Sequence, residues 1–176
     1  MDKVKWERLY EMIGELTPLT EDCGRLCGKK CCSEQGGGPG VYLFPGEERM
    51  FAGEAPWYRI EEHPGKVEHF TGRKPLLFNC RAKCPREKRP LACRLFPLAP
   101  RLDQSDSLEI VLDVDALFIC PLVRMGYPGA LNPAFAEAVR RVWLELLGYG
   151  PVRDSVREYS ARIDREAAEP WRRLLG

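Results

Sequence analysis

The chain has 176 residues, of which 44% are hydrophobic and 30% are charged, with a formal net charge of +1. This length and composition predict one domain with a buried core and exclude disorder as the main state. The eight cysteines are too sparse for a small secreted domain held together by disulfides.

The opening residues contain no apolar run of signal-peptide length, and no later run approaches the length of a membrane span. We therefore expect a cytoplasmic protein with no membrane contact and with reduced thiols. In a reducing compartment, clustered cysteines bind metal or carry out redox chemistry more often than they form disulfides.

The first predicted element is an amphipathic helix over residues 3–16, because apolar residues recur there at helical spacing. Thr17 and Pro18 end it. Residues 23–40 are rich in glycine, which disfavours a stable helix unless something else fixes the backbone. A bound metal would be such a fixing agent.

Short strands and turns are expected in the middle of the chain. The pattern predicts strands over 41–44, 57–60, 76–78 and 108–114, and a turn of helix over 45–50. No helix of useful length separates these segments, so we expect a small antiparallel sheet.

The last third of the chain is predicted to be helical. Asn132 and Pro133 suit the cap and first turn of one helix, and a second helix begins near Pro151. No linker divides the chain into separate domains.

The predicted fold is therefore a single α+β domain over residues 1–176. It combines a small antiparallel sheet and metal-bound cysteine loops with an N-terminal helix and two C-terminal helices. The cysteine core covers about residues 20–121, and the helical part covers about residues 132–176.

The cysteines fall into two groups of four along the chain. Four thiolates are the ligand set of a structural zinc site or of a 4Fe-4S iron-sulfur cluster. Glycine after Cys23 and after Cys27 lets the backbone turn its amide groups toward a ligand sulfur. The predicted metal ligands are Cys23, Cys27, Cys31 and Cys32 in the first group and Cys80, Cys84, Cys93 and Cys120 in the second.

The adjacent pair Cys31 and Cys32 leaves the division into sites open. In an extended segment neighbouring side chains point to opposite sides, so one of the pair can join the first group while the other faces the second. A single four-cysteine cluster, with the remaining thiols buried or reactive, is the other arrangement. Free cysteines also occur as small buried apolar residues, but four of them within ten residues of a glycine-rich loop favour ligation.

These motifs resemble the CxxCxxCC cysteine-cluster family, whose members are described as zinc- or iron-chelating and to which the flagellin lysine N-methylases are similar. The resemblance covers about residues 20–121. It rests on the run ending in Cys31-Cys32, on Cys80 and Cys84, on Arg-Pro-x-x-Cys-Arg-x-Phe-Pro at 89–97, and on Cys120. The first run here has one extra residue in each gap. The resemblance implies metal chelation, whereas the methylase activity is not carried over, because no motif for S-adenosylmethionine is recognisable.

A basic segment spans residues 73–101, where nine lysines and arginines accompany one acid, Glu87. Four thiolates around a zinc ion or an oxidised four-iron cluster carry a net charge of about −2, which nearby guanidinium groups would offset. We assign this cofactor-binding role to Arg89 and Arg94. A surface for an anionic partner such as nucleic acid, and an ordinary solvated face, are the alternatives.

Other polar residues give weaker signals. His63 and His69 flank a Pro-Gly turn and would be ligands in a mixed site, but eight cysteines leave no need for them. Asp113 and Asp115 alternate along the predicted strand, which places both carboxylates on one exposed face.

The leading hypothesis is a metal-binding cysteine-cluster protein that holds an iron-sulfur cluster, with structural zinc as the close alternative. One rival is a metal-dependent or redox enzyme with a reactive thiol beside the centre. The other rival is a nucleic-acid or protein interaction module that is folded by zinc and uses the basic segment. An open coordination position favours the enzyme, and a closed four-thiolate site under a continuous basic surface favours the module.

Overall fold

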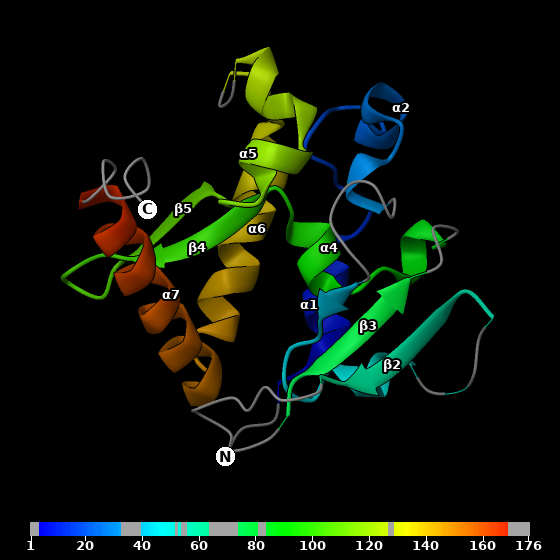
Figure 1. Ribbon diagram of the computed structural model, residues 1–176, viewed down its shortest axis with the longest axis horizontal. Helices are drawn as coiled ribbons and strands as arrows, with labels where there is room; N and C mark the ends of the chain where they lie inside the picture. Colours follow the sequence, from blue (N-terminus) through cyan, green and yellow to red (C-terminus); the bar gives the residue numbers. More distant parts are fainter. Residues whose placement is uncertain are drawn as a thin grey trace, which may run out of the picture.

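The computed structural model describes residues 4–32, 40–51, 53, 56–63, 74–80, 84–126 and 129–168. It confirms the predicted α+β class (Figure 1). Helix α6 (Pro133–Leu146) is central, and it packs against helix α1 (Trp6–Ile13) on one side and against a β-hairpin on the other. A separate three-stranded sheet lies beyond α1.

Helix α1 (Trp6–Ile13) is shorter than the predicted helix over 3–16. It ends where Gly14 adopts a φ of 46° and donates its N–H to the carbonyl of Tyr10 at 2.9 Å. A positive φ strains any residue with a Cβ atom, so glycine at this position terminates the helix. The buried face of α1 consists of Trp6, Leu9 and Ile13.

The three-stranded sheet has the order β1-β3-β2, and both pairings are antiparallel. Its strands are β1 (Val41–Tyr42), β2 (Tyr58–Glu62) and β3 (Leu76–Cys80). At Gly40 a Cβ atom would lie 2.4 Å from the carbonyl oxygen of Phe78, so only glycine fits beside β3. The three strands predicted in this region are confirmed, with shifted ends.

A second sheet is a hairpin of two antiparallel strands, β4 (Leu98–Leu102) and β5 (Leu108–Leu112). Strand β4 is not predicted from the sequence, because Pro100 at its centre argues against a strand. The single small sheet expected from the sequence is therefore two sheets.

The predicted strand over 108–114 ends two residues early, at Leu112. Asp113 begins a turn in which its carboxylate accepts the N–H of Asp115 at 2.9 Å. The prediction that both carboxylates lie on one exposed strand face is wrong. Asp115 is exposed, whereas Asp113 is half-buried, and burial raises the pKa of its carboxyl group.

Short helical segments connect the longer elements and carry most of the cysteines. They are α2 (Cys23–Cys27), η1 (Lys30–Cys32), η2 (Glu47–Phe51), η3 (Arg86–Lys88), α4 (Leu91–Leu95), α5 (Ala116–Ile119) and η4 (Pro121–Met125). The predicted turn of helix over 45–50 is confirmed as η2.

The two C-terminal helices are confirmed. Asn132 caps α6, because its side chain accepts the N–H of Ala134 at 3.0 Å. Helix α7 (Gly150–Ala168) begins just before Pro151. None of the described helices has the length and apolar character needed to cross a membrane.

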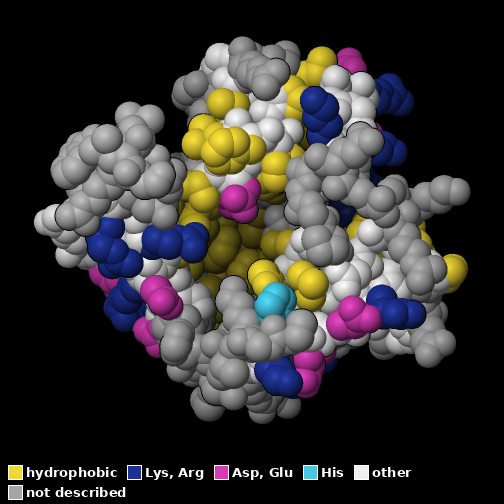
Figure 2. Space-filling view, viewed as in Figure 1, with side chains coloured by type: hydrophobic (Ala, Val, Ile, Leu, Met, Phe, Trp, Pro, Cys, Tyr) yellow, Lys and Arg dark blue, Asp and Glu magenta, His cyan; other side chains and the backbone are white. Residues whose placement is uncertain are grey.

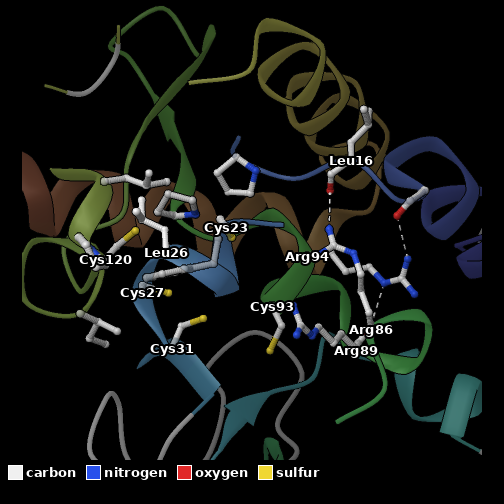
Figure 3. Close-up of a pocket in the computed structure, with 17 residues that line it drawn as sticks. Leu16, Cys23, Leu26, Cys27, Cys31, Arg86, Arg89, Cys93, Arg94 and Cys120 are labelled. Atoms are coloured by element: carbon white, nitrogen blue, oxygen red, sulfur yellow. Dashed lines mark hydrogen bonds between the residues drawn. The ribbon is translucent and has the colours of Figure 1, made fainter. Parts of the chain in front are cut away.

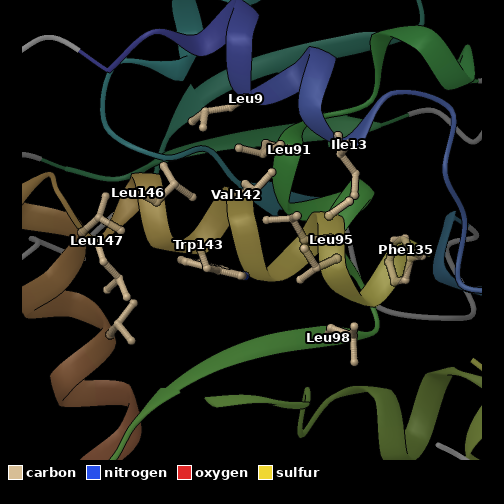
Figure 4. Packing of buried hydrophobic residues seen from close by; sticks show 14 of the residues in the cluster. Leu9, Ile13, Leu91, Leu95, Leu98, Phe135, Val142, Trp143, Leu146 and Leu147 are labelled. Carbon is tan, nitrogen blue, oxygen red and sulfur yellow. The ribbon is translucent and has the colours of Figure 1, made fainter. Parts of the chain in front are cut away.

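The hydrophobic core surrounds α6 and joins α1, α4, β4 and α7 (Figure 4). Burying each large aliphatic or aromatic side chain stabilises the fold by about 2 kcal/mol. The core includes Leu9, Ile13, Leu91, Leu95, Leu98, Phe135, Val142 and Leu146. Because Leu91 and Leu95 belong to α4, this core also fixes the helix that carries Cys93.

One buried hydrogen bond joins the hairpin to α7. The N–H of Leu102 donates to the hydroxyl of Ser160 at 2.9 Å, and that hydroxyl donates to the carbonyl of Val156 at 2.7 Å. We expect Ser160→Ala to lower the free energy of unfolding by about 1–2 kcal/mol, because the Leu102 N–H loses its partner. Urea denaturation measures this, with exposed Ser155→Ala as the control. Equal unfolding midpoints for the two variants would show that this bond does not stabilise the fold.

Candidate metal centre

A pocket lies between residues 23–32, helix α4 and the turn that follows α5 (Figure 3). Its walls combine thiols, guanidinium groups and apolar side chains. The thiols belong to Cys23, Cys27, Cys31, Cys93 and Cys120, the guanidinium groups to Arg86, Arg89 and Arg94, and the apolar wall includes Leu16, Leu26, Phe96, Ile119 and Leu122. Cysteines from three distant parts of the sequence therefore face one space.

Cys23 and Cys27 stand one turn apart on α2, so their side chains lie on the same side of the helix. The carboxylate of Asp22 accepts the N–H of Gly24 at 3.0 Å, and Gly28 closes the helix with a φ of 61°. These two caps fix a helix in a stretch where the sequence analysis expected none without a metal. No residue of α2 is fully buried, so the caps act with little support from the core.

The adjacent cysteines lie on η1 with their sulfur atoms 3.9 Å apart. The hydrogen bond between them lowers the pKa of Cys32 to about 6 and raises the pKa of Cys31. The nearby thiols of Cys27 and Cys23 raise the pKa of Cys31 further, whereas Arg89 lowers the pKa of Cys32. Beyond their mutual bond, the thiol of Cys31 is therefore influenced by the thiols of α2, and the thiol of Cys32 is influenced by the guanidinium group of Arg89.

Cys120 is a neighbour of the α2 thiols. Burial raises the pKa of Cys120, and the charge of Cys27 adds to the effect. Burial likewise raises the pKa of Cys23 to about 11, with smaller contributions from Cys27 and Cys120. The thiols of Cys23, Cys27, Cys31 and Cys120 thus form one neighbourhood around the pocket.

Cys80, Cys84 and Cys93 form a second neighbourhood together with Cys32. Burial raises the pKa of Cys84 to about 12, and both the charge of Cys80 and a hydrogen bond to its thiol contribute. The pKa of Cys93 is raised first by burial and then by the charges of Cys32 and Cys84. The two neighbourhoods meet at the pair Cys31 and Cys32.

Arg89 lies among the thiols of both neighbourhoods. Burial lowers the pKa of its guanidinium group, but the charges of Cys32, Cys84 and other thiols outweigh this effect and raise it. Its Nε atom is buried and has no hydrogen-bond partner among the described residues. Buried N–H groups without a partner are rare in folded proteins, so this donor is available to a bound anion or thiolate.

Arg94 lines the same pocket but uses its guanidinium group on the backbone. Its nitrogen atoms donate to the carbonyls of Arg89 at 3.1 Å, Gly14 at 3.2 Å and Glu87 at 2.6 Å. The group also lies 4.7 Å from the ring centre of Tyr10. Arg94 thereby ties α4 to α1, and the cofactor-binding role expected for it from the sequence stays a prediction.

Glu47 is a buried carboxylate that the sequence does not predict as part of the site. It accepts the hydroxyl of Tyr10 at 2.6 Å, the N–H of Leu91 at 2.6 Å and the N–H of Phe44 at 2.9 Å. Burial raises its pKa, and these donors oppose that effect. Nothing in the sequence separates Glu47 from its neighbour Glu48. Because Leu91 opens α4, Glu47 holds the start of the helix that carries Cys93.

The eight cysteines are free of disulfides. Within the described part of the chain, no three His, Cys, Asp or Glu side chains are placed closely enough to hold a metal ion. Five of the thiols therefore face one pocket, but among the described residues they are not arranged as the ligands of a single ion.

The sequence predicts that neither His63 nor His69 is needed as a metal ligand, and the structure describes one of the two. His63 follows β2, and its ring centre lies 5.8 Å from that of Tyr42. His69 lies outside the described residues. The prediction that neither is a metal ligand stays a prediction.

Basic side chains of the segment 73–101 form ion pairs with acidic residues in different parts of the molecule. Arg86 pairs with Glu15 and Asp22, each at 3.3 Å, and Arg101 pairs with Asp164 at 2.8 Å. Figure 2 shows lysines and arginines interspersed with acidic side chains on the face that it displays. Ion pairing of this kind does not favour one continuous basic surface among the described residues. A role for the segment with an anionic partner stays a prediction.

Comparisons with models of protein families, with curated proteins and with solved structures found no match to this chain. The resemblance to the CxxCxxCC cysteine-cluster family therefore rests on the sequence motifs and stays a prediction.

Proposed function

We propose that this protein is a metal-binding cysteine-cluster protein that holds an iron-sulfur cluster in the pocket. The ligands are Cys23, Cys27, Cys31 and Cys120. The observation that carries the proposal is the meeting of these four thiols around one pocket, although Cys120 is far from the other three in the sequence. Figure 3 shows the labelled side chains of Cys27, Cys31 and Cys120 among the residues that line this pocket.

The spacing of the thiols favours a cluster over a zinc ion. Zinc–sulfur bonds are about 2.3 Å long, so a tetrahedral zinc site requires sulfur atoms about 3.8 Å apart. Among the described residues, no group of three or more His, Cys, Asp or Glu side chains is placed to hold a single metal ion. A four-iron cluster places its ligands farther apart, because the ligands bind different iron atoms of the cluster. A pocket bordered by the four thiols suits such a group.

The surroundings of the pocket suit a cluster as well. Leu16, Leu26 and Ile119 give it apolar walls. Arg89 adds a buried N–H donor without a partner, and hydrogen bonds to sulfur together with nearby positive charge stabilise an anionic cluster. When bound, the cluster would supply electron transfer or a fixed structural crosslink, while the chain binds it, shields it and offsets its charge.

Reconstitution tests the ligand set. The full chain is incubated without oxygen with ferrous iron, sulfide and a thiol reductant, and the cluster is measured by its visible absorption and its electron paramagnetic resonance after reduction. We expect Cys120→Ser to lose at least about nine-tenths of the cluster signal, because the pocket loses one of its four ligands.

His63→Ala is the matched control and should keep the parental signal, because His63 lies beside Tyr42 rather than in the pocket. Circular dichroism shows whether each variant remains folded. A parental amount of cluster in folded Cys120→Ser would contradict the assignment of Cys120.

A further inference from the structure

Cys31 and Cys32 are adjacent in the sequence, and their sulfur atoms lie 3.9 Å apart on the short helix η1. We propose that this pair is a modification site, which a small-molecule disulfide such as oxidised glutathione converts reversibly into a disulfide between adjacent residues. The disulfide withdraws Cys31 from the proposed cluster shell and thereby controls whether the pocket can be filled. This control rests on the proposed function, whereas the disulfide itself requires no cluster.

The first argument is the contact between the two thiols. In the reduced chain they are hydrogen-bonded to each other, so each sulfur atom already faces the other. The N–H of Cys32 donates to the carbonyl of Lys29 at 2.7 Å, and this bond holds the turn that carries the pair. The two sulfur atoms that would be joined are therefore neighbours before any oxidant arrives.

The second argument is access. Cys31 lines the pocket and is also exposed to solvent, and Cys32 is half-buried. No residue of η1 is fully buried, so the segment can adjust without disturbing the hydrophobic core. A small disulfide can reach Cys31 directly, and the backbone can follow when the new bond closes.

The third argument concerns reversibility. Disulfides usually join Cα atoms about 4.4–6.8 Å apart, whereas adjacent Cα atoms across a trans peptide are about 3.8 Å apart. A disulfide between adjacent residues is therefore strained. Strained or exposed disulfides are easily reduced, and they are the labile or regulatory ones rather than the structural ones. This property suits a switch.

The reaction is a thiol–disulfide exchange in two steps. One thiolate of the pair attacks a sulfur atom of oxidised glutathione, so that a mixed disulfide forms and one glutathione leaves as its thiolate. The second thiolate then attacks the protein sulfur of the mixed disulfide, the bond between Cys31 and Cys32 forms, and the second glutathione leaves. The pair loses two electrons and two protons, which convert the oxidant into two thiols.

Oxidation of the pair competes with the proposed cluster for one sulfur atom. The sulfur of Cys31 cannot ligate iron while it is bonded to Cys32, and the disulfide leaves Cys23, Cys27 and Cys120 as three of the four proposed ligands. Conversely, a cluster that is already bound holds Cys31 and protects it from exchange. The reduced pair is thus the state that can accept a cluster.

The test measures the pair directly in the full chain. Metal-free protein is equilibrated without oxygen in excess oxidised glutathione, quenched with acid, alkylated and digested. Trypsin cleaves after Lys30 and Arg49, which releases the pair on a peptide with no other cysteine. By mass spectrometry we expect at least about half of this peptide to carry an internal disulfide, and excess reduced glutathione should restore both thiols.

Three comparisons complete the experiment. Cys84→Ser removes a thiol outside the pair and should form the disulfide to the parental extent. Cys32→Ser should instead leave Cys31 as a mixed disulfide with glutathione. The parental chain that is reconstituted with iron and sulfide before the same treatment should keep both thiols of the pair open to alkylation. Circular dichroism shows that each variant is folded.

Two results would overturn the modification site: no internal disulfide in the metal-free parental chain, or a disulfide that mainly links the peptide to another cysteine. Equal oxidation of metal-free protein and of protein that holds a cluster would overturn the control of the pocket. Failure of the iron-sulfur proposal looks different, because the reconstituted chain would then show no cluster absorption while the metal-free chain still forms the disulfide.

Discussion

We expect Glu47→Ala to lower the free energy of unfolding by about 3 kcal/mol or more. The carboxylate of Glu47 is fully buried and satisfies the hydroxyl of Tyr10 and the N–H groups of Leu91 and Phe44. Alanine leaves these donors without partners, and each unsatisfied buried donor costs about 1–3 kcal/mol. Urea denaturation of anaerobic protein, followed by circular dichroism, measures the loss.

The matched control is Glu11→Ala, which removes an exposed carboxylate from α1 and should change the unfolding free energy by less than about 0.5 kcal/mol. Glu47→Gln keeps the size of the side chain, but it replaces one accepting oxygen with an NH₂ donor, so we expect an intermediate loss. Equal stability of Glu47→Ala and Glu11→Ala would contradict the role given to Glu47.

Removal of metal should expose the segment from Cys23 to Cys32 to protease. Neither α2 nor η1 has a fully buried residue, so ligation is the main interaction that could hold this segment against its chain entropy. After a chelator has removed iron and zinc without oxygen, we expect trypsin to cleave after Arg25 and Lys29 roughly tenfold faster than in the metal-loaded protein.

Mass spectrometry of the fragments gives the rate at each position. Arg140 and Arg141 on α6 provide the internal control, because that helix lies in the hydrophobic core and has no cysteine. Unchanged cleavage after Arg25 and Lys29 would contradict a stabilising role for the metal in this segment.

Elements with a strong local signal could be predicted from the sequence. The cap at Asn132, the apolar stripe of α6 and the strands beginning at Val41 and Leu76 follow from residue type and spacing alone. The exact ends could not be predicted, because they depend on backbone angles such as the positive φ of Gly14. Strand β4 escaped prediction because its proline conceals the pattern, and pairing with β5 overrides that signal.

The candidate site was predictable in composition but not in arrangement. The sequence identifies eight cysteines and Arg89, but their grouping depends on contacts between distant segments. Cys120 follows Cys93 in the sequence and yet lies near the thiols of α2. The role of Glu47 has no signal in the sequence, because only folding buries it and leaves the adjacent Glu48 half-buried.

The contacts around α4 connect the fold to the proposed chemistry. Glu47 holds the N–H of Leu91 at the start of α4, and Arg94 joins the same helix to the carbonyl of Gly14. These bonds fix Cys93 and Arg89 relative to α1 without using either side chain. A buried network that holds a helix in place can therefore support the proposed metal centre without contacting it.

The most direct test of the central claim is elemental analysis of the anaerobically purified parental chain for iron, zinc and acid-labile sulfide. The proposal predicts brown protein with about four iron atoms and about four sulfides per chain. Colourless protein that contains zinc but neither iron nor sulfide would contradict the iron-sulfur cluster.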